Sequence, residues 1–161
     1  MDNEKRIRSP ISFDNNLINH KSVYFDVEGE PFAKQRPRAA RKGRFITIYT
    51  PNETKKYESK VLSYYNRENR GIQLQGDLTV EIEGIFSIPK SASKIKASKM
   101  ISGEIPHTSK PDCDNMGKIC LDALNGVAYN DDATINKLII SKRYGEDPKV
   151  RITIIENTNI K

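Results

Sequence analysis

Two groups of aspartates lie close together in the sequence, although the chain as a whole is basic. The segment KPDCDNMGK places Asp112 and Asp114 one residue apart, with Lys118 four residues beyond the second aspartate. A second pair, Asp131 and Asp132, follows in the segment NDD. Carboxylate oxygens are the ligands that Mg²⁺ prefers, usually one or two of them together with phosphate oxygens and water. The aspartates are therefore either solvated turn and cap residues or ligands of a metal ion.

The choice between these two interpretations depends on the surrounding residues. An aspartate in the first turn of a helix is a favourable partner of the helix dipole, so D-x-D alone favours a structural role. Here D-x-D-N is followed by Lys118 and by a D-D pair before the next strand, which favours a metal site. We expect that strand to run back alongside the helix and to bring Asp132 near Asp112 and Asp114. Lys118 could then pair with a carboxylate or contact a phosphate as its charge builds.

A cationic segment lies upstream of the aspartates. Between Lys34 and Arg44 the chain has six basic residues and no acidic one, interrupted by Pro37 and Gly43. We interpret the segment as a flexible basic loop that returns through a short strand, RFITIYT, and whose cations bind phosphate groups. The chain has 27 Lys and Arg against 21 Asp and Glu, a net charge of +6, which also favours nucleic acid as a partner. The predicted DNA-binding residues are Lys34, Arg36, Arg38, Arg41, Lys42, Arg44 and Lys110.

Three further residues could react or bind but are given a lesser role. His107 precedes the acidic segment and is interpreted as a surface residue that could support the site or contact phosphate. Cys113 and Cys120 are seven residues apart, which is about 10 Å along one helix. That distance exceeds the reach of a disulfide, so we expect both thiols to stay reduced.

The spacing of apolar residues predicts the elements that would hold these groups. Alternation predicts strands in the segments SVYFDVEGEP and DLTVEIEGIFSIP. ATINKLIISKRY and KVRITIIE are also predicted to be strands, joined by a turn at GEDP. Spacings of three and four predict helices over residues 52 to about 70 and from Met116 to Leu124, and a short helix near residues 92–100 is possible. The order predicts an α+β fold, with a small mixed sheet and two main helices packed on it. We expect one domain over residues 21–157, preceded by a flexible extension, residues 1–20.

The chain has no sign of membrane insertion or secretion. No apolar run approaches the roughly 20 residues that span a bilayer. The start of the chain, MDNEKRIRSP, is charged and lacks the apolar stretch of a signal peptide. We therefore expect an intracellular, cytoplasmic protein without a membrane partner.

The acidic segment also resembles a known signature. KPDCDNMGKICLDALNGVAYNDD, followed by ATINKLIISKRY, resembles the pattern of the RusA family of Holliday-junction resolvases. That pattern has a basic residue, D-x-D-N, a lysine four residues after the second aspartate, D-A-L-N-G, and D-D before a strand. The segments KQRPR, IYTP and KYESKV resemble the family's N-terminal part, and the similarity covers about residues 22–156.

The resemblance implies an endodeoxyribonuclease that uses Mg²⁺, for which Mn²⁺ can substitute. It implies a homodimer that resolves branched DNA, namely four-way junctions, by paired symmetric nicks in recombination and repair. By their place in the pattern, Asp112, Asp114 and Asp132 correspond to metal-binding aspartates and Lys118 to a catalytic lysine. Asp131 corresponds to the less critical member of the acidic pair, with a supporting role at most.

Two points stay open from the sequence. The protein could instead be a catalytically inactive or non-enzymatic, structure-selective DNA-binding module, or more distantly an RNA nuclease. The last two strands carry apolar residues on both faces, as at Ile139 and Ile140 and at Ile154 and Ile155. Such a pattern is expected where a second copy covers one face of the sheet, although a helix of the same chain on each face would also explain it.

Overall fold

The computed structural model describes residues 21–157, and the predicted extension, residues 1–20, lies outside the described part. The centre is a four-stranded mixed sheet in the order β1-β6-β4-β5. It is formed by β1 (Ser22–Glu28), β4 (Leu78–Ser87), β5 (Ile135–Gly145) and β6 (Lys149–Glu156). β6 is antiparallel to both β1 and β4, whereas β4 and β5 are parallel. The prediction of an α+β fold with a small mixed sheet is confirmed.

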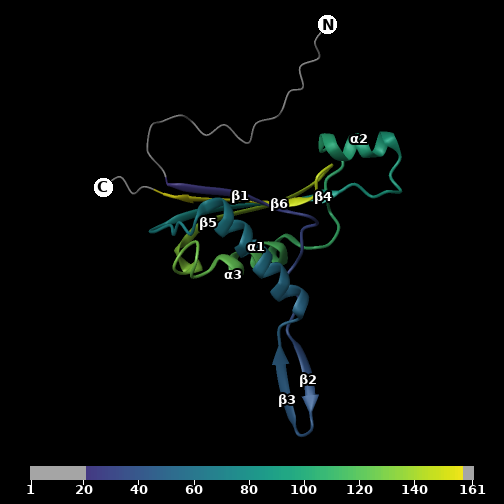
Figure 1. The fold of residues 1–161 in the computed structure, drawn as a ribbon. Helices are drawn as coiled ribbons and strands as arrows, with labels where there is room; N and C mark the ends of the chain where they lie inside the picture. The colour runs from purple at the N-terminus through teal and green to yellow at the C-terminus, as the bar shows by residue number, and fades with distance from the viewer. Residues whose placement is uncertain (1–20, 158–161) are drawn as a thin grey trace.

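Two helices cover one face of this sheet (Figure 1). The helix α1 (Asn52–Asn69) buries Tyr57, Val61 and Tyr65 at spacings of four, and α3 (Cys113–Leu124) buries its own apolar stripe. The strands meet them with alternate residues, such as Val23, Phe25 and Val27 of β1, and these side chains form the core. The periodicities of the sequence thus predicted both helices and the face that each buries.

The opposite face of the sheet carries charged and mixed side chains. Asp26 bonds to Arg151 at 3.1 Å and to Lys149 at 3.1 Å, and Glu83 bonds to Arg143 at 2.8 Å. Among the described residues, both main helices lie on the other face, so the alternative explanation, a helix of the same chain on each face, does not apply. Ile139 is exposed there, whereas Ile154 is buried against the helices.

The basic segment is not a loop but half of a β-hairpin, which corrects our interpretation of the sequence. β2 (Arg38–Lys42) pairs antiparallel with β3 (Phe45–Tyr49), and the connection is the two residues Gly43 and Arg44. Gly43 has a φ of +63°, which glycine adopts without strain. RAARK contains no β-branched or aromatic residue, and its strand forms because FITIY supplies a partner with high β-propensity. The hairpin projects from the body of the protein (Figure 1).

The remaining elements are short. The helix α2 (Lys94–Ser102) begins after Ser93, whose hydroxyl accepts a hydrogen bond from the Lys96 backbone N–H, and it lies at one end of the sheet. A 3₁₀ turn, η1 (Asp132–Thr134), leads into β5. No helix in the described part of the chain is long and apolar enough to cross a membrane.

Candidate active site

The first two aspartates lie at the start of α3 and face solvent. Asp112 immediately precedes the helix in an extended conformation, yet its carboxylate makes no capping hydrogen bond. That carboxylate is 53% exposed and pairs with the exposed ammonium of Lys110 at 3.4 Å. Asp114 occupies the first turn and is also exposed. Since neither carboxylate is occupied by capping the helix, both remain available to a ligand.

The helix that carries these aspartates lies very close to the sheet. A Cβ atom on Gly117 would come within 2.3 Å of Ile140 Cδ1, and one on Gly84 within 2.4 Å of Met116 Sδ. Gly117 belongs to α3 and Gly84 to β4, so a missing side chain on each surface allows the approach. The start of α3 is therefore held on a rigid sheet rather than on a loop.

A lysine on β5 fixes the segment that leads into α3. Lys142 Nζ donates hydrogen bonds to the carbonyl oxygens of Ser109 at 2.7 Å and Pro111 at 2.8 Å. The sequence reasoning missed this residue. The available signal was its position, because Leu138, Ile140, Lys142 and Tyr144 alternate along one face of the strand, and a lysine there interrupts an otherwise apolar row.

Asp132 does not join the first two aspartates in this structure, which corrects the expectation that all three would lie close together. Within the described residues no three acidic, cysteine or histidine side chains are grouped closely enough to hold a metal ion. β5 does run back along α3, since Ile140 contacts Gly117 while Lys142 reaches Pro111. A strand that runs antiparallel to a helix begins beside the end of that helix. Because Asp132 precedes β5, it lies toward the end of α3, whereas the first two aspartates lie at its start.

Tyr129 supports this placement of Asp132. The tyrosine is buried, and its hydroxyl donates to the Leu121 carbonyl at 2.9 Å near the end of α3. Burial raises the pKa of Tyr129, and the negative charges of Asp132 and Asp122 raise it further. Asp132 and Asp122 are thus both close enough to influence the same phenol. Asp131 caps the 3₁₀ turn by accepting the Ala133 N–H at 2.8 Å.

Lys118 remains available for chemistry. It is exposed on α3 between Asp114 and Asp122, one turn from each. In the part of the chain that the structure describes, the side chains of Lys118, Asp114 and Asp132 form no hydrogen bond or ion pair. A side chain in a structural ion pair must leave its partner before it can bind a ligand. These three side chains have no such partner to leave.

Lys34 was predicted to bind DNA, but its ammonium is occupied within the protein. It forms ion pairs with Asp122 of α3 and with Glu58 of α1, the latter at 3.2 Å. Its backbone N–H also donates to the Asn115 carbonyl at 3.0 Å. Lys34 therefore joins the two main helices, and it is removed from the candidate phosphate-binding groups. The pairing was hidden in the sequence because Asp122 is 88 residues away.

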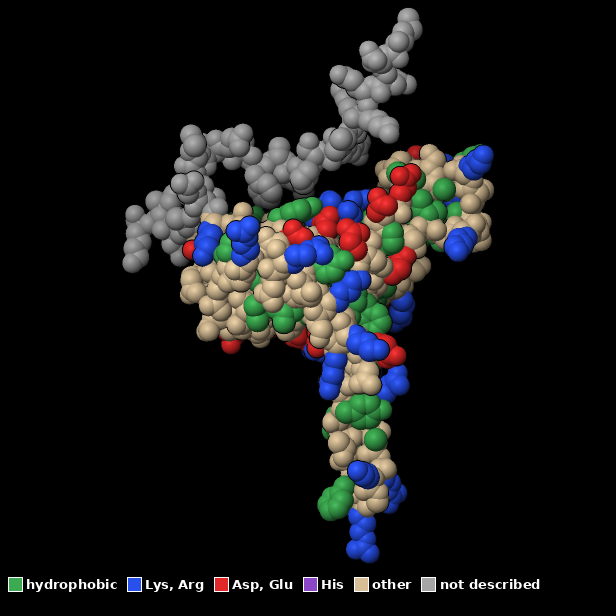
Figure 2. Space-filling view, in the orientation of Figure 1, with side chains coloured by type: hydrophobic (Ala, Val, Ile, Leu, Met, Phe, Trp, Pro, Cys, Tyr) green, Lys and Arg blue, Asp and Glu red, His purple; other side chains and the backbone are tan. Residues whose placement is uncertain are grey.

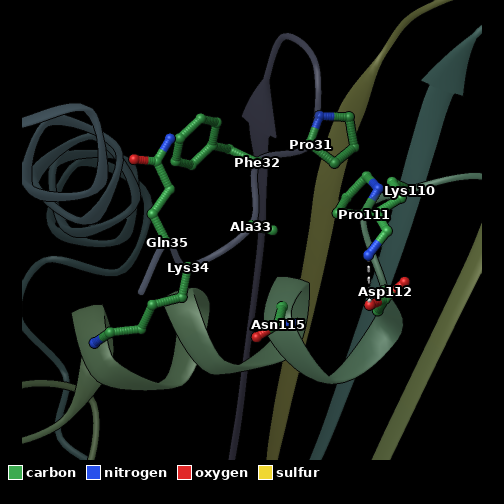
Figure 3. Close-up of a pocket in the computed structure, with 9 residues that line it drawn as sticks. All are labelled: Pro31, Phe32, Ala33, Lys34, Gln35, Lys110, Pro111, Asp112 and Asn115. Atoms are coloured by element: carbon green, nitrogen blue, oxygen red, sulfur yellow. Dashed lines mark hydrogen bonds and ion pairs between the residues drawn. The ribbon is translucent and has the colours of Figure 1, made fainter. Parts of the chain in front are cut away.

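A cleft lies beside Asp112 (Figure 3). Residues 31–35 form one wall, and Lys110, Pro111, Asp112 and Asn115 form the other, around a volume of about 410 Å³. The side chain of Lys34 runs along α3 away from Asp112, whereas Lys110 turns toward it. The remaining predicted cations are exposed on and next to the hairpin, which carries blue and green side chains in Figure 2; they are Arg36, Arg38, Arg41, Lys42 and Arg44.

His107 is buried, which corrects its interpretation as a surface residue. Its ring stacks on Phe86 with centroids 3.9 Å apart and touches Tyr144, and its Nδ1 has no hydrogen-bond partner within the described residues. Burial lowers the pKa of His107, and the nearby charge of Lys142 lowers it further. Because the ring is buried between aromatic side chains, we assign it to packing against Phe86 of β4 and Tyr144 of β5.

The lowered pKa of His107 predicts acid sensitivity of the fold. Below about pH 6.5 the unfolded chain binds a proton at this residue more readily than the folded protein does. The free energy of unfolding should therefore decrease as the pH is lowered below that value. His107→Phe keeps the stacking and removes the titration. We expect the loss of unfolding free energy between pH 7 and pH 5.5, measured by urea denaturation, to be smaller in this variant. Equal losses in both proteins would contradict the assignment.

Comparison with known proteins places the chain in a family. Residues 28–155 match the family described as endodeoxyribonuclease RusA. The chain belongs to the RusA endodeoxyribonuclease family. This RusA-family chain is also 32% identical over 136 residues to the uncharacterized protein YqaN of Bacillus subtilis (strain 168), a match that covers 83% of the chain and 96% of YqaN. The resemblance seen in the sequence is thereby confirmed, and the RusA match includes all of α3, η1 and β5.

Proposed function

We propose that this RusA-family protein is a Mg²⁺-dependent endonuclease that resolves four-way DNA junctions in recombination and repair. The observation that carries the proposal is the pair of solvent-facing carboxylates at the start of α3, Asp112 and Asp114, which the fold does not use for capping. A cleft adjoins Asp112, and the cationic hairpin follows residues 31–35, which form one wall of that cleft. Acidic ligands and phosphate-binding groups in one small domain suit a phosphodiester substrate.

The residues present fit a magnesium ion. Asp112 and Asp114 offer hard oxygen donors, and two carboxylates completed by substrate phosphate and water are the usual environment of Mg²⁺. Mn²⁺ can replace Mg²⁺ at such donors. When bound, the ion would activate water and stabilise the leaving 3′ oxygen.

The chain's own groups would bind and orient the phosphodiester. Lys118 presents an ammonium with no partner among the described residues, and we assign it to the negative charge that builds on the phosphate. Lys110 beside Asp112 would hold a neighbouring phosphate. Lys142 is a positioning residue, because it holds the backbone of Ser109 and Pro111 and thereby the start of α3.

The role of Lys142 predicts a loss of turnover without a loss of DNA binding. Lys142→Met keeps the aliphatic stem but leaves two carbonyl groups without their donor, so Asp112 should shift relative to Asp114. Displacements of about 1 Å cost up to about 100-fold in rate, and we expect kcat to fall by at least about tenfold with KM little changed. Lys137→Met, an exposed lysine on the same strand, is the matched control. A fall in DNA affinity with unchanged kcat would contradict the positioning role.

The proposal includes a homodimer. A four-way junction has two equivalent strands to cut, and one chain offers one acidic site, so symmetric cleavage requires two copies related by a two-fold axis. We expect a dimer by sedimentation and, on a supercoiled cruciform plasmid, direct conversion to linear DNA by two nicks in one complex. A monomer at micromolar concentration that accumulates nicked circles would contradict the dimer.

A direct assay tests the function itself. Purified protein is incubated with a labelled four-way junction and, in parallel, with a linear duplex of the same sequence, in Mg²⁺ or in EDTA. We expect junction cleavage in Mg²⁺ alone and little cleavage of the duplex. Tight junction binding without cleavage in Mg²⁺ or Mn²⁺ would instead establish the alternative, an inactive structure-selective DNA-binding module.

A further inference from the structure

The β2–β3 hairpin exposes large apolar side chains that the cations alone do not explain. On β3, Phe45 is 77% exposed, Ile46 72% and Ile48 73%, and Tyr49 is exposed as well. Every residue of both strands faces solvent. A group of apolar side chains that protrudes from a protein marks a binding surface more often than it is an accident of the fold.

The register places a cation beside most of these apolar side chains. Lys42 pairs with Phe45, Arg41 with Ile46, and Arg38 with Tyr49. Directly paired residues lie on the same face of a hairpin, so apolar and cationic groups alternate in space on both faces. A nucleic acid strand has the matching order, since each flat, apolar base lies next to a charged phosphate.

The shape of the hairpin also fits insertion. Strands of five residues extend about 17 Å, and Phe45 is the first residue after the Gly43–Arg44 turn, at the far end of the arm. In Figure 2 the arm is narrow, and its hydrophobic and basic side chains lie outside the body that contains the cleft. An aromatic ring at the tip of a narrow arm can enter a gap that the body of the protein could not enter.

We propose that Phe45, at the tip of the hairpin, inserts as a wedge among the bases at the branch point of the junction, while the cations of β2 hold the flanking phosphates. The inference rests on the proposed function and names how the branch is recognised. Apolar side chains that separate base steps must overcome stacking of a few kcal/mol per step. At a branch point strands cross from one arm to another and the helix is interrupted, so insertion there is easier than in a duplex.

Charge favours DNA over a second protein chain as the occupant. Residues 31–52 contain no acidic residue, and a second copy of this chain has a net charge of +6. Two copies of the arm would bring like charges together, whereas the phosphate backbone attracts both. The segment therefore suits an anionic partner that also offers flat apolar surfaces.

The test uses a four-way junction with 2-aminopurine at the branch point, in EDTA so that no cleavage occurs. We expect the fluorescence to rise when wild-type protein binds, because the probe loses its stacking. Phe45→Ala should lose most of that rise and bind the junction about tenfold more weakly, with little change on a linear duplex, since base–aromatic stacking has that magnitude. Phe45→Trp should retain the rise. Ile95→Ala, an exposed apolar residue on α2, is the matched control.

Several outcomes would overturn the wedge. A fluorescence rise that is unchanged in Phe45→Ala would show that another group opens the branch. A Phe45→Ala protein that sediments as a smaller species than wild type would assign the hairpin to an interface between copies. The proposed function fails separately, in the Mg²⁺ cleavage assay: a protein that raises the fluorescence but never cleaves retains the wedge and loses the endonuclease.

Discussion

Asp112→Asn and Asp114→Asn should each reduce junction cleavage by about 100-fold or more while leaving the fold and junction binding intact. Each change removes one hard oxygen ligand at the start of α3, and losses of this size follow the removal of single groups that stabilise charge in a transition state. Because Asp112 makes no capping hydrogen bond, its replacement should not destabilise the helix. Binding should be unchanged or slightly tighter, because the amide no longer repels phosphate.

The same experiment examines Asp132 and Lys118. We expect Asp132→Asn to be milder than the other two, because Asp132 does not lie with Asp112 and Asp114. Lys118→Ala should be severe without rescue by arginine, whose planar guanidinium does not replace a compact ammonium. Asp147→Asn, an exposed aspartate between β5 and β6, controls for the loss of one negative charge. Single-turnover cleavage and thermal unfolding are measured for each protein. Full activity in the Asp112 and Asp114 variants would contradict the assignment of the active site to the start of α3.

Removing the hairpin arginines should have the second largest effect, on DNA affinity and its salt dependence. Arg36, Arg38, Arg41 and Arg44 are exposed and free of acidic partners among the described residues. For every phosphate that is no longer neutralised, the slope of log affinity against log salt should become shallower by about 0.9 on duplex arms. Replacing all four arginines by alanine should therefore reduce the slope by about 3 to 4. DNA affinity is measured by fluorescence anisotropy over a range of salt concentrations, and the slope is taken from those values.

The control for this prediction is a second variant that has the same net charge as the hairpin variant. Lys90, Lys94, Lys96 and Lys99 lie on and before α2, at the end of the sheet, and replacing these four removes an equal number of cations. An equal decrease of the slope in both variants would show that DNA affinity depends on the overall charge of the protein and not on the position of the cations on the hairpin. A steep slope that survives in the hairpin variant would mean that its arginines are merely solvated.

Local patterns in the sequence predicted the elements of the fold well. The stripes of α1 and α3 and the alternation of β1 and β4 report which face each element buries, and the structure confirms them. The strand β2 was missed because RAARK has no intrinsic preference for a strand. It is extended because FITIY pairs with it across Gly43, which is a property of the partner and not of the segment.

The candidate site was predicted less completely, because its geometry depends on long-range contacts. The sequence predicts a free cation at Lys34, but the packing of two helices brings Glu58 and Asp122 to it. Asp132 was expected beside Asp112, but the direction of β5 relative to α3 places it toward the other end of the helix. Lys142 gave only a weak signal, a lysine within an apolar row. The sequence thus predicted which types of residue the candidate site contains, but not the distances between their side chains.

The most direct test of junction resolution is to map the cuts on a four-way junction whose four strands are labelled one at a time. In Mg²⁺ we expect cuts at symmetric positions in two opposing strands, close to the branch point, and products whose nicks DNA ligase can seal. The same mixture with Asp112→Asn should show no cuts. Cuts scattered along the duplex arms, or in one strand only, would contradict a resolvase that acts through the acidic site at the start of α3.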